Sequence, residues 1–397
     1  MHEKEKLASF KTLEKNFKNF DLNFSQENMQ DYLNFIYINN LNNLNPVLEK
    51  LSEWEYGVGY LTEGKLKDNL RFSYPDPETN INFKTQINIA RSNYSPKPLD
   101  ANKLKNISQN ISQNILKLHC PICFENIGLG GIPGKENLRA FSLELGLNRN
   151  FFIQFTPFPL FPYHCVLIDQ LPRPMIMSEQ SVIDLTNFIQ KAPGYTGCSN
   201  SDVEWAGASI LIHHHYQVFK DLKLPIMDAE WDSKNYKKTN IQGYTLEFGF
   251  LNYPIACIKL MCRDLSVFTQ SAGALIRSWK AQDPGKNTLN LIIKYDELKN
   301  TWIAYLILRN PDHRTSPDLA YIKSEGVGII EVAGEGIYPV PKDGENKTGK
   351  EILEEIKTNG LEIIKTIIQN NNPLDKKFWP EQFLSFEKII SELADLE

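Results

Sequence analysis

Residues 150–169, NFFIQFTPFPLFPYHCVLID, constrain the fold most, because this segment is rich in aromatic and β-branched residues and is interrupted by prolines. Runs of this composition, bounded by Pro, Gly and Asn, are typical of β-strands and turns. Shorter runs of the same kind occur at 72–76 and 82–92. Further strands are predicted over 242–252, 254–262, 288–295 and 301–308.

Helical periodicity appears elsewhere in the chain. Residues 178–191 begin with a serine and an acidic residue and then place apolar residues on one face, which predicts a helix. A second helix is predicted near 265–281. Residues 1–50 and the segment from 350 onward also carry apolar residues at helical spacing. The Gly-, Ser- and Asn-rich stretch 194–202 is predicted to be a loop.

This mixture of short strands and amphipathic helices predicts an α+β fold with a mainly antiparallel sheet and helices packed on it. We expect a helical N-terminal extension over 1–52 and a main domain over 53–345. That domain is expected to hold its site motifs within 80–220 and a second part within 240–345. A helical tail is expected over 346–397. No internal repeat is visible.

Composition narrows the class of protein. The 397 residues include 42% hydrophobic and 23% charged residues, as in ordinary globular proteins. The net charge of −5 gives no general reason to expect nucleic-acid binding. The sequence contains no run of 18 or more apolar residues, so we expect no membrane-spanning helix. The charged N-terminus lacks the apolar core of a secretory signal. Six cysteines are too few for a disulfide scaffold, so we expect a cytoplasmic protein without a membrane partner.

The three consecutive histidines in GASILIHHHYQVF, residues 207–219, are the strongest chemical signal. On a strand, alternate side chains share a face, so His213, His215 and Gln217 should point one way, while His214 points the other way as a bystander. Two imidazoles and an amide on one face suit phosphoryl chemistry: one imidazole attacks phosphorus and the amide holds an oxygen. The alternative is that these polar residues merely face solvent.

Four motifs in the same order make the resemblance specific. They are Gln86-x-Asn88-x-x-Arg91, Cys120-x-x-Cys123-x-x-Asn126, Thr156-Pro-Phe-Pro-x-Phe-Pro162, and Gly207-Ala-Ser209 followed by His213-x-His215-x-Gln217. Together they resemble the histidine-triad (HIT-like) superfamily, in the branch of galactose-1-phosphate uridylyltransferase, GDP-L-galactose phosphorylase and diadenosine tetraphosphate phosphorylase. An uncharacterised bacterial family in that branch is the most similar. The resemblance covers roughly 80–220, and a weaker match runs through 306–314.

The resemblance implies roles for individual residues. His215 would be the nucleophile that forms a covalent nucleotidyl-histidine, His213 would orient the site, and Gln217 would bind the phosphate. The nucleotide and phosphate would also contact a wider set: Ser209, Arg91, Asn88, Gln86, Thr156, Phe158, Arg309 and Arg314. For Arg91, Arg309 and Arg314 the alternative is an ordinary surface arginine.

A metal site is implied only in part. Cys120 and Cys123 supply two ligands of a tetrahedral zinc, and in zinc-containing relatives the first histidine of the triad, here His213, is a third. The position of the fourth ligand falls on Pro172, which cannot bind a metal, and His119 is a candidate substitute. A structural zinc and a pair of reduced cysteines therefore both stay open, and the chemistry itself requires no cofactor.

The leading function is a nucleotidyltransferase or phosphorylase acting on a nucleoside diphosphate-sugar or dinucleoside polyphosphate. Inorganic phosphate or a sugar phosphate would be the second substrate, and a homodimer is one candidate assembly. Gln217, in place of the third histidine of the hydrolase branch, favours transfer over hydrolysis. A nucleotide hydrolase and an inactive nucleotide-binding protein are the alternatives.

Overall fold

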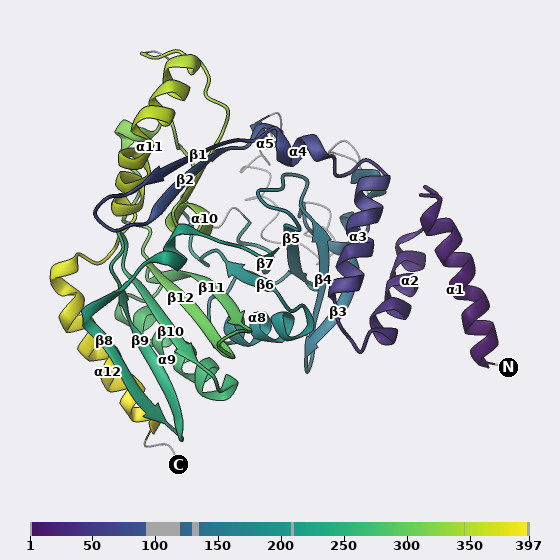
Figure 1. Ribbon diagram of the computed structural model, residues 1–397, viewed down its shortest axis with the longest axis horizontal. Helices are drawn as coiled ribbons and strands as arrows, with labels where there is room; N and C mark the ends of the chain where they lie inside the picture. The colour runs from purple at the N-terminus through teal and green to yellow at the C-terminus, as the bar shows by residue number, and fades with distance from the viewer. Residues whose placement is uncertain (1, 93–119, 129–134, 208–209, 345, 395–397) are drawn as a thin grey trace, which may run out of the picture.

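A computed structural model describes residues 2–92, 120–128, 135–207, 210–344 and 346–394. Within these residues, the strands form one large sheet and one small sheet, with helices on the faces of both (Figure 1). The predicted α+β fold is confirmed.

The large sheet carries the histidine motif near its middle. Its neighbouring strands are all antiparallel. In spatial order, the ten strands found among the described residues are β3 (Phe141–Gly146), β4 (Arg149–Phe155), β5 (Cys165–Asp169), β7 (His215–Lys220), β6 (Tyr195–Ser199), β11 (Thr288–Asp296), β12 (Thr301–Arg309), β10 (Cys257–Cys262), β9 (Tyr244–Leu251) and β8 (Trp231–Ile241).

The two faces of the large sheet have separate hydrophobic cores. Tyr216 and Val218 of β7 belong to the core under the long helices, whereas Phe219 belongs to the core on the opposite face. This division follows from the alternation of side chains along a strand. The helices of the first core are α8 (Glu179–Lys191), α9 (Leu265–Gln282) and α12 (Trp379–Ala394), together with the N-terminal α1 (His2–Lys18), α2 (Gln26–Asn39) and α3 (Asn45–Gly57). The short helix α4 (Glu63–Lys67) follows α3 and contributes no buried residue.

The small sheet lies over the face that carries Phe219. It contains β1 (Leu70–Pro75), β2 (Asn82–Ile87) and β13 (Glu335–Tyr338), and α11 (Gly349–Asn370) packs on it. Short elements complete the described chain: α5 (Ile89–Ser92), α10 (Ile329–Val332), and the 3-10 helices η1 (Phe124–Asn126), η2 (Lys135–Asn137), η3 (Pro225–Asp228), η4 (Pro317–Leu319) and η5 (Lys376–Phe378).

Helix α2 covers the free edge of the large sheet at β3. The Gln26 amide donates to the carbonyl of Ala140 at 2.7 Å and accepts from its N–H at 2.9 Å. The Gln30 amide does the same with Ser142, at 2.9 and 2.7 Å. Two side chains thus replace the backbone partners that an edge strand lacks, which is one way to stop edge-to-edge association.

Most predicted elements are found, but three differ from expectation. The predicted loop 194–202 contains the buried strand β6, whose backbone pairs with both β7 and β11. The aromatic stretch 150–169 is two strands joined by a turn over 156–164. The edge strands β3 and β8 were not predicted: β8 is mostly polar and largely exposed or half-buried, whereas β3 has the regular alternation of a strand and was missed.

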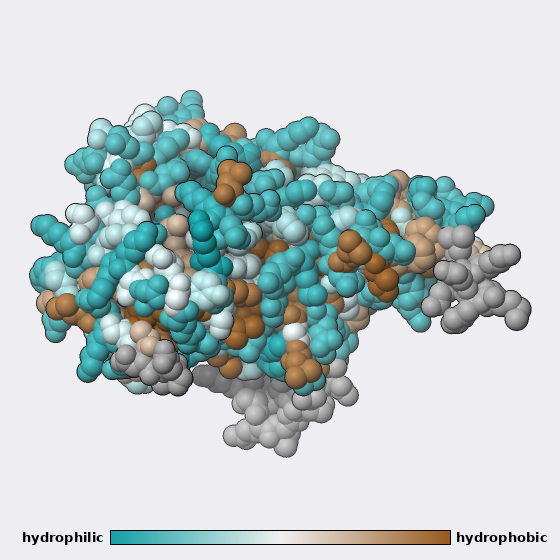
Figure 2. All heavy atoms as spheres, turned by 60° about the horizontal axis from the view of Figure 1, so that its bottom comes forward, coloured by the Kyte–Doolittle hydropathy of each residue, from teal (hydrophilic) through white to brown (hydrophobic). Residues whose placement is uncertain are grey.

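The surface in Figure 2 is mostly hydrophilic, with small and separate hydrophobic patches. Among the described residues, no helix combines the length and the apolar character needed to span a bilayer.

Candidate active site

The site forms where β5 ends and β7 begins, on the face of the large sheet opposite the long helices. The register pairs Ile168 with His215 and Val166 with Gln217. His215 and Gln217 therefore share this face, as the sequence predicted. His213, however, lies in the loop just before β7 rather than on the strand.

The ring of His215 is held in the tautomer that nucleophilic attack needs. Its Nδ1 lies 2.8 Å from the backbone carbonyl oxygen of His213. Because a carbonyl can only accept a hydrogen bond, Nδ1 carries the proton and Nε2 has the lone pair. Burial lowers the pKa of His215, despite the raising effect of this hydrogen bond. The imidazole is therefore neutral and nucleophilic at neutral pH.

The amide of Gln217 is oriented by a residue that the sequence did not single out for the site. His164 Nε2 lies 3.1 Å from Gln217 Oε1, and the Leu160 N–H donates to His164 Nδ1 at 3.3 Å. Since Nδ1 accepts, Nε2 must be protonated and must donate to the Gln217 oxygen. The NH₂ group of Gln217 is consequently turned away from His164 and can donate to a phosphoryl oxygen.

His164 is fixed by its surroundings as well as by these hydrogen bonds. Its ring stacks on Phe219, with 4.3 Å between the ring centroids. Burial lowers the pKa of His164 to about 3, so the ring stays neutral over the physiological range. No sequence motif includes His164; only its distance to Gln217 reveals a role in the site.

Gln86 supports this arrangement indirectly. Its amide nitrogen donates to the Leu160 carbonyl at 3.2 Å and to the Glu335 carboxylate at 3.1 Å. Its amide oxygen accepts from Asn69 at 2.9 Å. Both ends of the buried Gln86 side chain are thus engaged with protein, and through Leu160 they hold the turn that carries His164.

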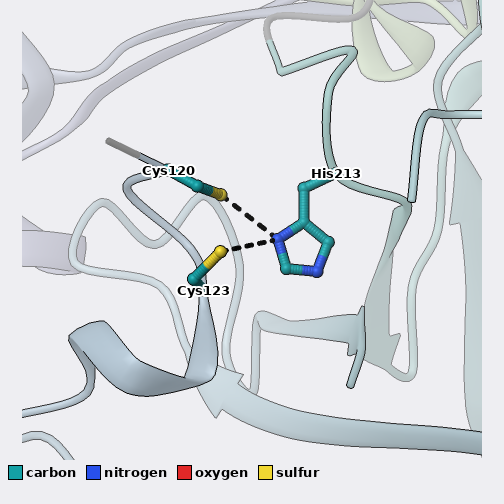
Figure 3. A group of neighbouring side chains, drawn as sticks. All are labelled: Cys120, Cys123 and His213. Carbon is teal, nitrogen blue, oxygen red and sulfur yellow. Dashed lines mark hydrogen bonds between the residues drawn. The ribbon is translucent and has the colours of Figure 1, made fainter. Parts of the chain in front are cut away.

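His213 turns toward the cysteine pair (Figure 3). Its Nδ1 lies 3.2 Å from Cys120 Sγ and 3.5 Å from Cys123 Sγ, and all three side chains are buried. Its Nε2 lies 2.8 Å from the Asp169 carbonyl oxygen, which can only accept a proton. Nδ1 is therefore the nitrogen directed at the sulfurs, as in a metal-bound histidine held by a backbone carbonyl.

The charge of the cluster suits a cation. The hydrogen bond with Cys123 lowers the pKa of Cys120 to about 5, and the contact with His213 adds to this effect. Among the described residues, no fourth His, Cys, Asp or Glu side chain joins the three. His119 lies outside the described residues.

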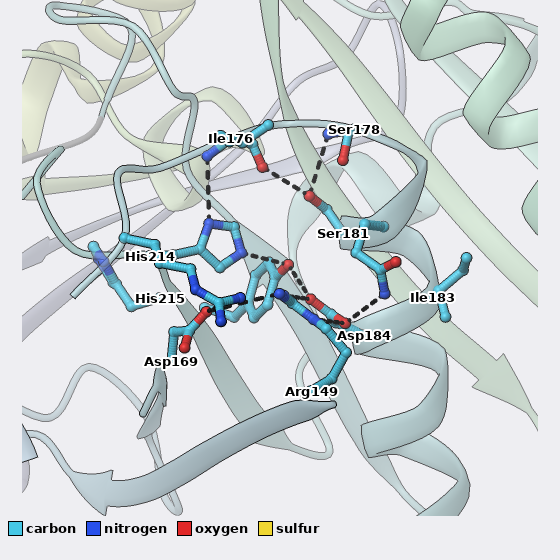
Figure 4. Close-up of polar contacts among 12 residues, drawn as sticks. Arg149, Asp169, Ile176, Ser178, Ser181, Ile183, Asp184, His214 and His215 are labelled. Atoms are coloured by element: carbon cyan, nitrogen blue, oxygen red, sulfur yellow. Dashed lines mark hydrogen bonds and ion pairs between the residues drawn. The ribbon is translucent and has the colours of Figure 1, made fainter. Parts of the chain in front are cut away.

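His214 points to the opposite face, as predicted, but it is not a bystander (Figure 4). Its Nδ1 accepts from the Ile176 N–H at 3.3 Å, so its Nε2–H donates to the Tyr216 hydroxyl at 2.6 Å. That hydroxyl donates to Asp184 at 2.9 Å, and Arg149 pairs with the same carboxylate. This buried chain of polar contacts fastens β7 to helix α8 directly behind His215.

The remaining phosphate-binding candidates lie in different settings. Arg91 forms an exposed ion pair with Glu325 at 2.9 Å. Asn88 accepts from the Arg91 N–H at 3.0 Å, which caps the short helix α5. Thr156 accepts from the Phe158 N–H at 3.3 Å within the β4–β5 turn, so both belong to a turn and not to a strand.

The two arginines from the weaker match, Arg309 and Arg314, lie in different surroundings. Arg309 is fully buried and donates to Asn290, to the Val327 carbonyl at 2.9 Å and to Asn371 at 3.0 Å. Its guanidinium joins elements of the core rather than facing the site. Arg314 is exposed. Ser209 lies outside the described residues.

Several known proteins are similar to this chain over most of its length. No family model matches the chain. Galactose-1-phosphate uridylyltransferase of Caldanaerobacter subterraneus is 26% identical over 376 positions, covering 85% of this chain and 68% of the relative. The same enzyme of Clostridium acetobutylicum is 25% identical, covering 89% and 73%. That of Staphylococcus carnosus is 29% identical, covering 59% and 50%. The chain thus spans about half to three quarters of the length of these relatives.

Solved structures with a similar fold are those of yeast Ap4A phosphorylase. Yeast Ap4A phosphorylase in complex with Ap4A superposes with a TM-score of 0.52 at 14% identity, covering 83% of this chain and 97% of that one. Its complex with AMP gives a TM-score of 0.50 and covers 82% and 94%.

Proposed function

We propose that this chain, which is similar to galactose-1-phosphate uridylyltransferases and shares the fold of Ap4A phosphorylase, is an enzyme of that HIT-like branch and transfers a nucleotidyl group through His215. The donor is a nucleoside diphosphate-sugar or a dinucleoside polyphosphate. The acceptor is a sugar phosphate or inorganic phosphate. The observation that carries this proposal is the hydrogen bond from His215 Nδ1 to the His213 carbonyl, which leaves Nε2 free to attack.

The reaction has two balanced steps. His215 Nε2 attacks the α-phosphorus of the donor, an N–P bond forms, and the P–O bond to the leaving phosphate breaks. An acceptor phosphate oxygen then attacks the same phosphorus, and the N–P bond breaks to restore the neutral imidazole. The His213 carbonyl stabilises the positive charge that the ring gains when Nε2 bonds to phosphorus and loses when that bond breaks, because it accepts from Nδ1.

Gln217 supplies the matching donor. Its NH₂ group, set by His164, can bind a non-bridging oxygen of the transferred phosphoryl group while negative charge moves during attack. Unlike a histidine at this position, an amide has no pKa near neutrality and cannot pass a proton to or from water or a leaving group. This difference favours transfer or phosphorolysis over hydrolysis.

The chemistry requires no cofactor, and we propose that Cys120, Cys123 and His213 hold a structural zinc. The direction of His213 Nδ1 and the lowered pKa of the Cys120 thiol support this, and a bound zinc would fix the loop that carries the His213 carbonyl. Metal analysis of the purified protein should find zinc near one per chain, and Cys120→Ser should lower it. A zinc content near zero in protein purified without chelators would exclude the metal.

We also propose a cytoplasmic location and, as one candidate assembly, a homodimer. The cytoplasm fits six buried cysteines that are thiols rather than disulfides. A homodimer, if it forms through the large sheet, would use the β8 edge, because α2 covers the β3 edge.

The test is capture of the covalent intermediate. Protein incubated with UDP-glucose, UDP-galactose or Ap4A labelled at the α-phosphate should retain acid-labile label, and His215→Ala should abolish it. Lys388→Ala is the control, because this exposed residue of α12 lies on the opposite side of the sheet; it should keep the label. Absence of label with every donor would contradict the proposal.

Product analysis separates the alternatives. Phosphorolysis or transfer should release product only when phosphate or a sugar phosphate is added. Release that is independent of both acceptors would indicate a hydrolase instead, and nucleotide binding without turnover would indicate an inactive binding protein.

A further inference from the structure

Exposed large apolar side chains gather on the loops around His215. Leu171 and Ile176 lie in the β5–α8 connection, and Trp205 and Ile212 lie in the β6–β7 connection. Both connections start where β5 and β6 end, next to the first residues of β7. Of the six tryptophans, Trp205 is the one that is exposed, with 41% of its surface accessible to solvent.

The loop that carries Trp205 starts and ends at the site. Cys198 pairs with Gln217, so the next residues of the two strands bring Asn200 to the register of His215. Residues 200–207 therefore leave the sheet beside the nucleophile, and residues 210–214 return to it. The β6 side of this loop, which includes Trp205, therefore starts next to the nucleophile.

This loop is anchored rather than free. Asp202 accepts from the Thr288 hydroxyl at 2.6 Å and pairs with Lys280 at 2.5 Å. Asn200 accepts from the Ile329 N–H at 2.9 Å. These bonds tie the start of the loop to β11, α9 and α10 in the absence of a ligand.

The conformation of Trp205 is itself unusual. Its φ of +69° lies in the left-handed region, which a bulky residue rarely adopts and which costs free energy. The Arg314 guanidinium carbon lies 4.9 Å from the ring centroid and covers one face of the indole. The exposed surface of the ring is consequently the other face and its edge.

A second arginine, Arg91, is connected to the Trp205 loop through residues 325–326. Gly326 packs against the Trp205 backbone, where an added Cβ would lie 3.4 Å from the Trp205 carbonyl oxygen. The preceding residue, Glu325, forms the exposed ion pair with Arg91. An aromatic face with arginines behind and beside it matches a nucleotide, which offers a flat base and a negative phosphate.

We propose that the open face of Trp205, backed by Arg314, is the platform on which the base of the bound nucleotide stacks. The inference rests on the proposed function, because the donor must be a nucleotide. Stacking tolerates any base, so the platform provides affinity, and selection among bases falls to groups at the ring edge.

Intrinsic fluorescence tests the platform directly. UMP and AMP are titrated into the wild-type protein, with ribose 5-phosphate as a ligand that lacks a base. Both nucleotides should quench the fluorescence to saturation. Trp205→Ala should weaken binding of UMP and AMP about 10-fold or more, while binding of ribose 5-phosphate stays within 2-fold of wild type.

Two further variants serve as controls for the loss of the aromatic ring and for the source of the fluorescence signal. Trp205→Phe keeps an aromatic face, so its nucleotide affinity, measured by calorimetry, should stay within about 3-fold while the quenching is lost. Trp231→Phe, in the edge strand β8, should keep both. Wild-type affinity for UMP and AMP in Trp205→Ala would overturn the platform, as would quenching that persists in Trp205→Phe.

Failure of the platform and failure of the proposed function are distinguishable. Covalent label on His215 combined with unchanged binding in Trp205→Ala would reject the platform alone. Trp205-dependent binding without any label would reject the transfer reaction and keep the platform.

Discussion

The ring of His164 determines which end of the Gln217 amide faces the reacting phosphate. The Leu160 N–H leaves only Nε2 as a donor, and that donor engages the Gln217 oxygen at 3.1 Å. His164 does not touch the phosphate in this arrangement and acts through Gln217. It is therefore a positioning residue, and its loss should resemble the loss of the amide.

We expect His164→Phe to keep the stacked ring but to lower kcat for nucleotidyl transfer about 10- to 100-fold, because the amide can rotate. Gln217→Ala should give a similar loss. In the double variant the two losses should not add, since both remove the same oriented donor. Fully additive effects in this cycle would show that His164 acts independently of Gln217.

The buried neutral His164 also predicts how stability depends on pH. Its pKa is lowered to about 3 in the folded protein, against about 6.5 when unfolded. Between these values only the unfolded chain binds the proton, so stability falls as pH falls through this window, by up to about 1.4 kcal/mol per pH unit. Above pH 6.5 the contribution is complete.

Urea unfolding at pH 7, 6 and 5 measures this slope. His164→Gln cannot take up the proton, so its stability should fall less steeply with acidification than that of the wild type. Equal slopes for the two proteins would mean that the ring is protonated in the folded state.

Helix α2 shows how an element outside the site shapes the molecule. Gln26 and Gln30 complete the hydrogen bonds of β3 at a free sheet edge. Without them, four backbone groups at Ala140 and Ser142 lose their partners, and the edge becomes a template for another strand.

We expect Gln26→Ala with Gln30→Ala to lower the free energy of unfolding by about 2–4 kcal/mol and to promote association. Urea unfolding and sedimentation velocity measure the two effects. Asp31→Ala, an exposed change on the same helix, should have little effect on either. A double variant that stays as stable and as dispersed as the wild type would rule out edge protection by α2.

At the scale of the whole molecule, Arg309 connects the C-terminal segment to the large sheet. It extends from β12 to Asn290 on β11, to the carbonyl of Val327, and to Asn371 at the end of α11. Burial lowers the pKa of Arg309 to about 10, so the guanidinium stays charged at neutral pH. The sequence motif placed this residue among phosphate ligands, whereas the fold uses it as a cross-link.

Arg309→Leu should lower the free energy of unfolding by roughly 3 kcal/mol, because three partners lose a buried donor. Arg263→Leu, at an exposed position, should change it by less than about 0.5 kcal/mol. Urea midpoints compare the two. If Arg309→Leu instead abolished nucleotide binding at unchanged stability, the residue would be a phosphate ligand after all.

The sequence by itself determined the α+β class, most helices, and the shared face of His215 and Gln217, because each depends on local periodicity. It could not place His164 against Gln217, which are 53 residues apart, nor Gln86 beneath Leu160, because such contacts arise only when strands and turns pack. The same packing moved Arg309 into the core and turned His214 into a buried tie to α8. The open face of Trp205 depends on a loop held by three other elements, so only the tertiary structure decided it.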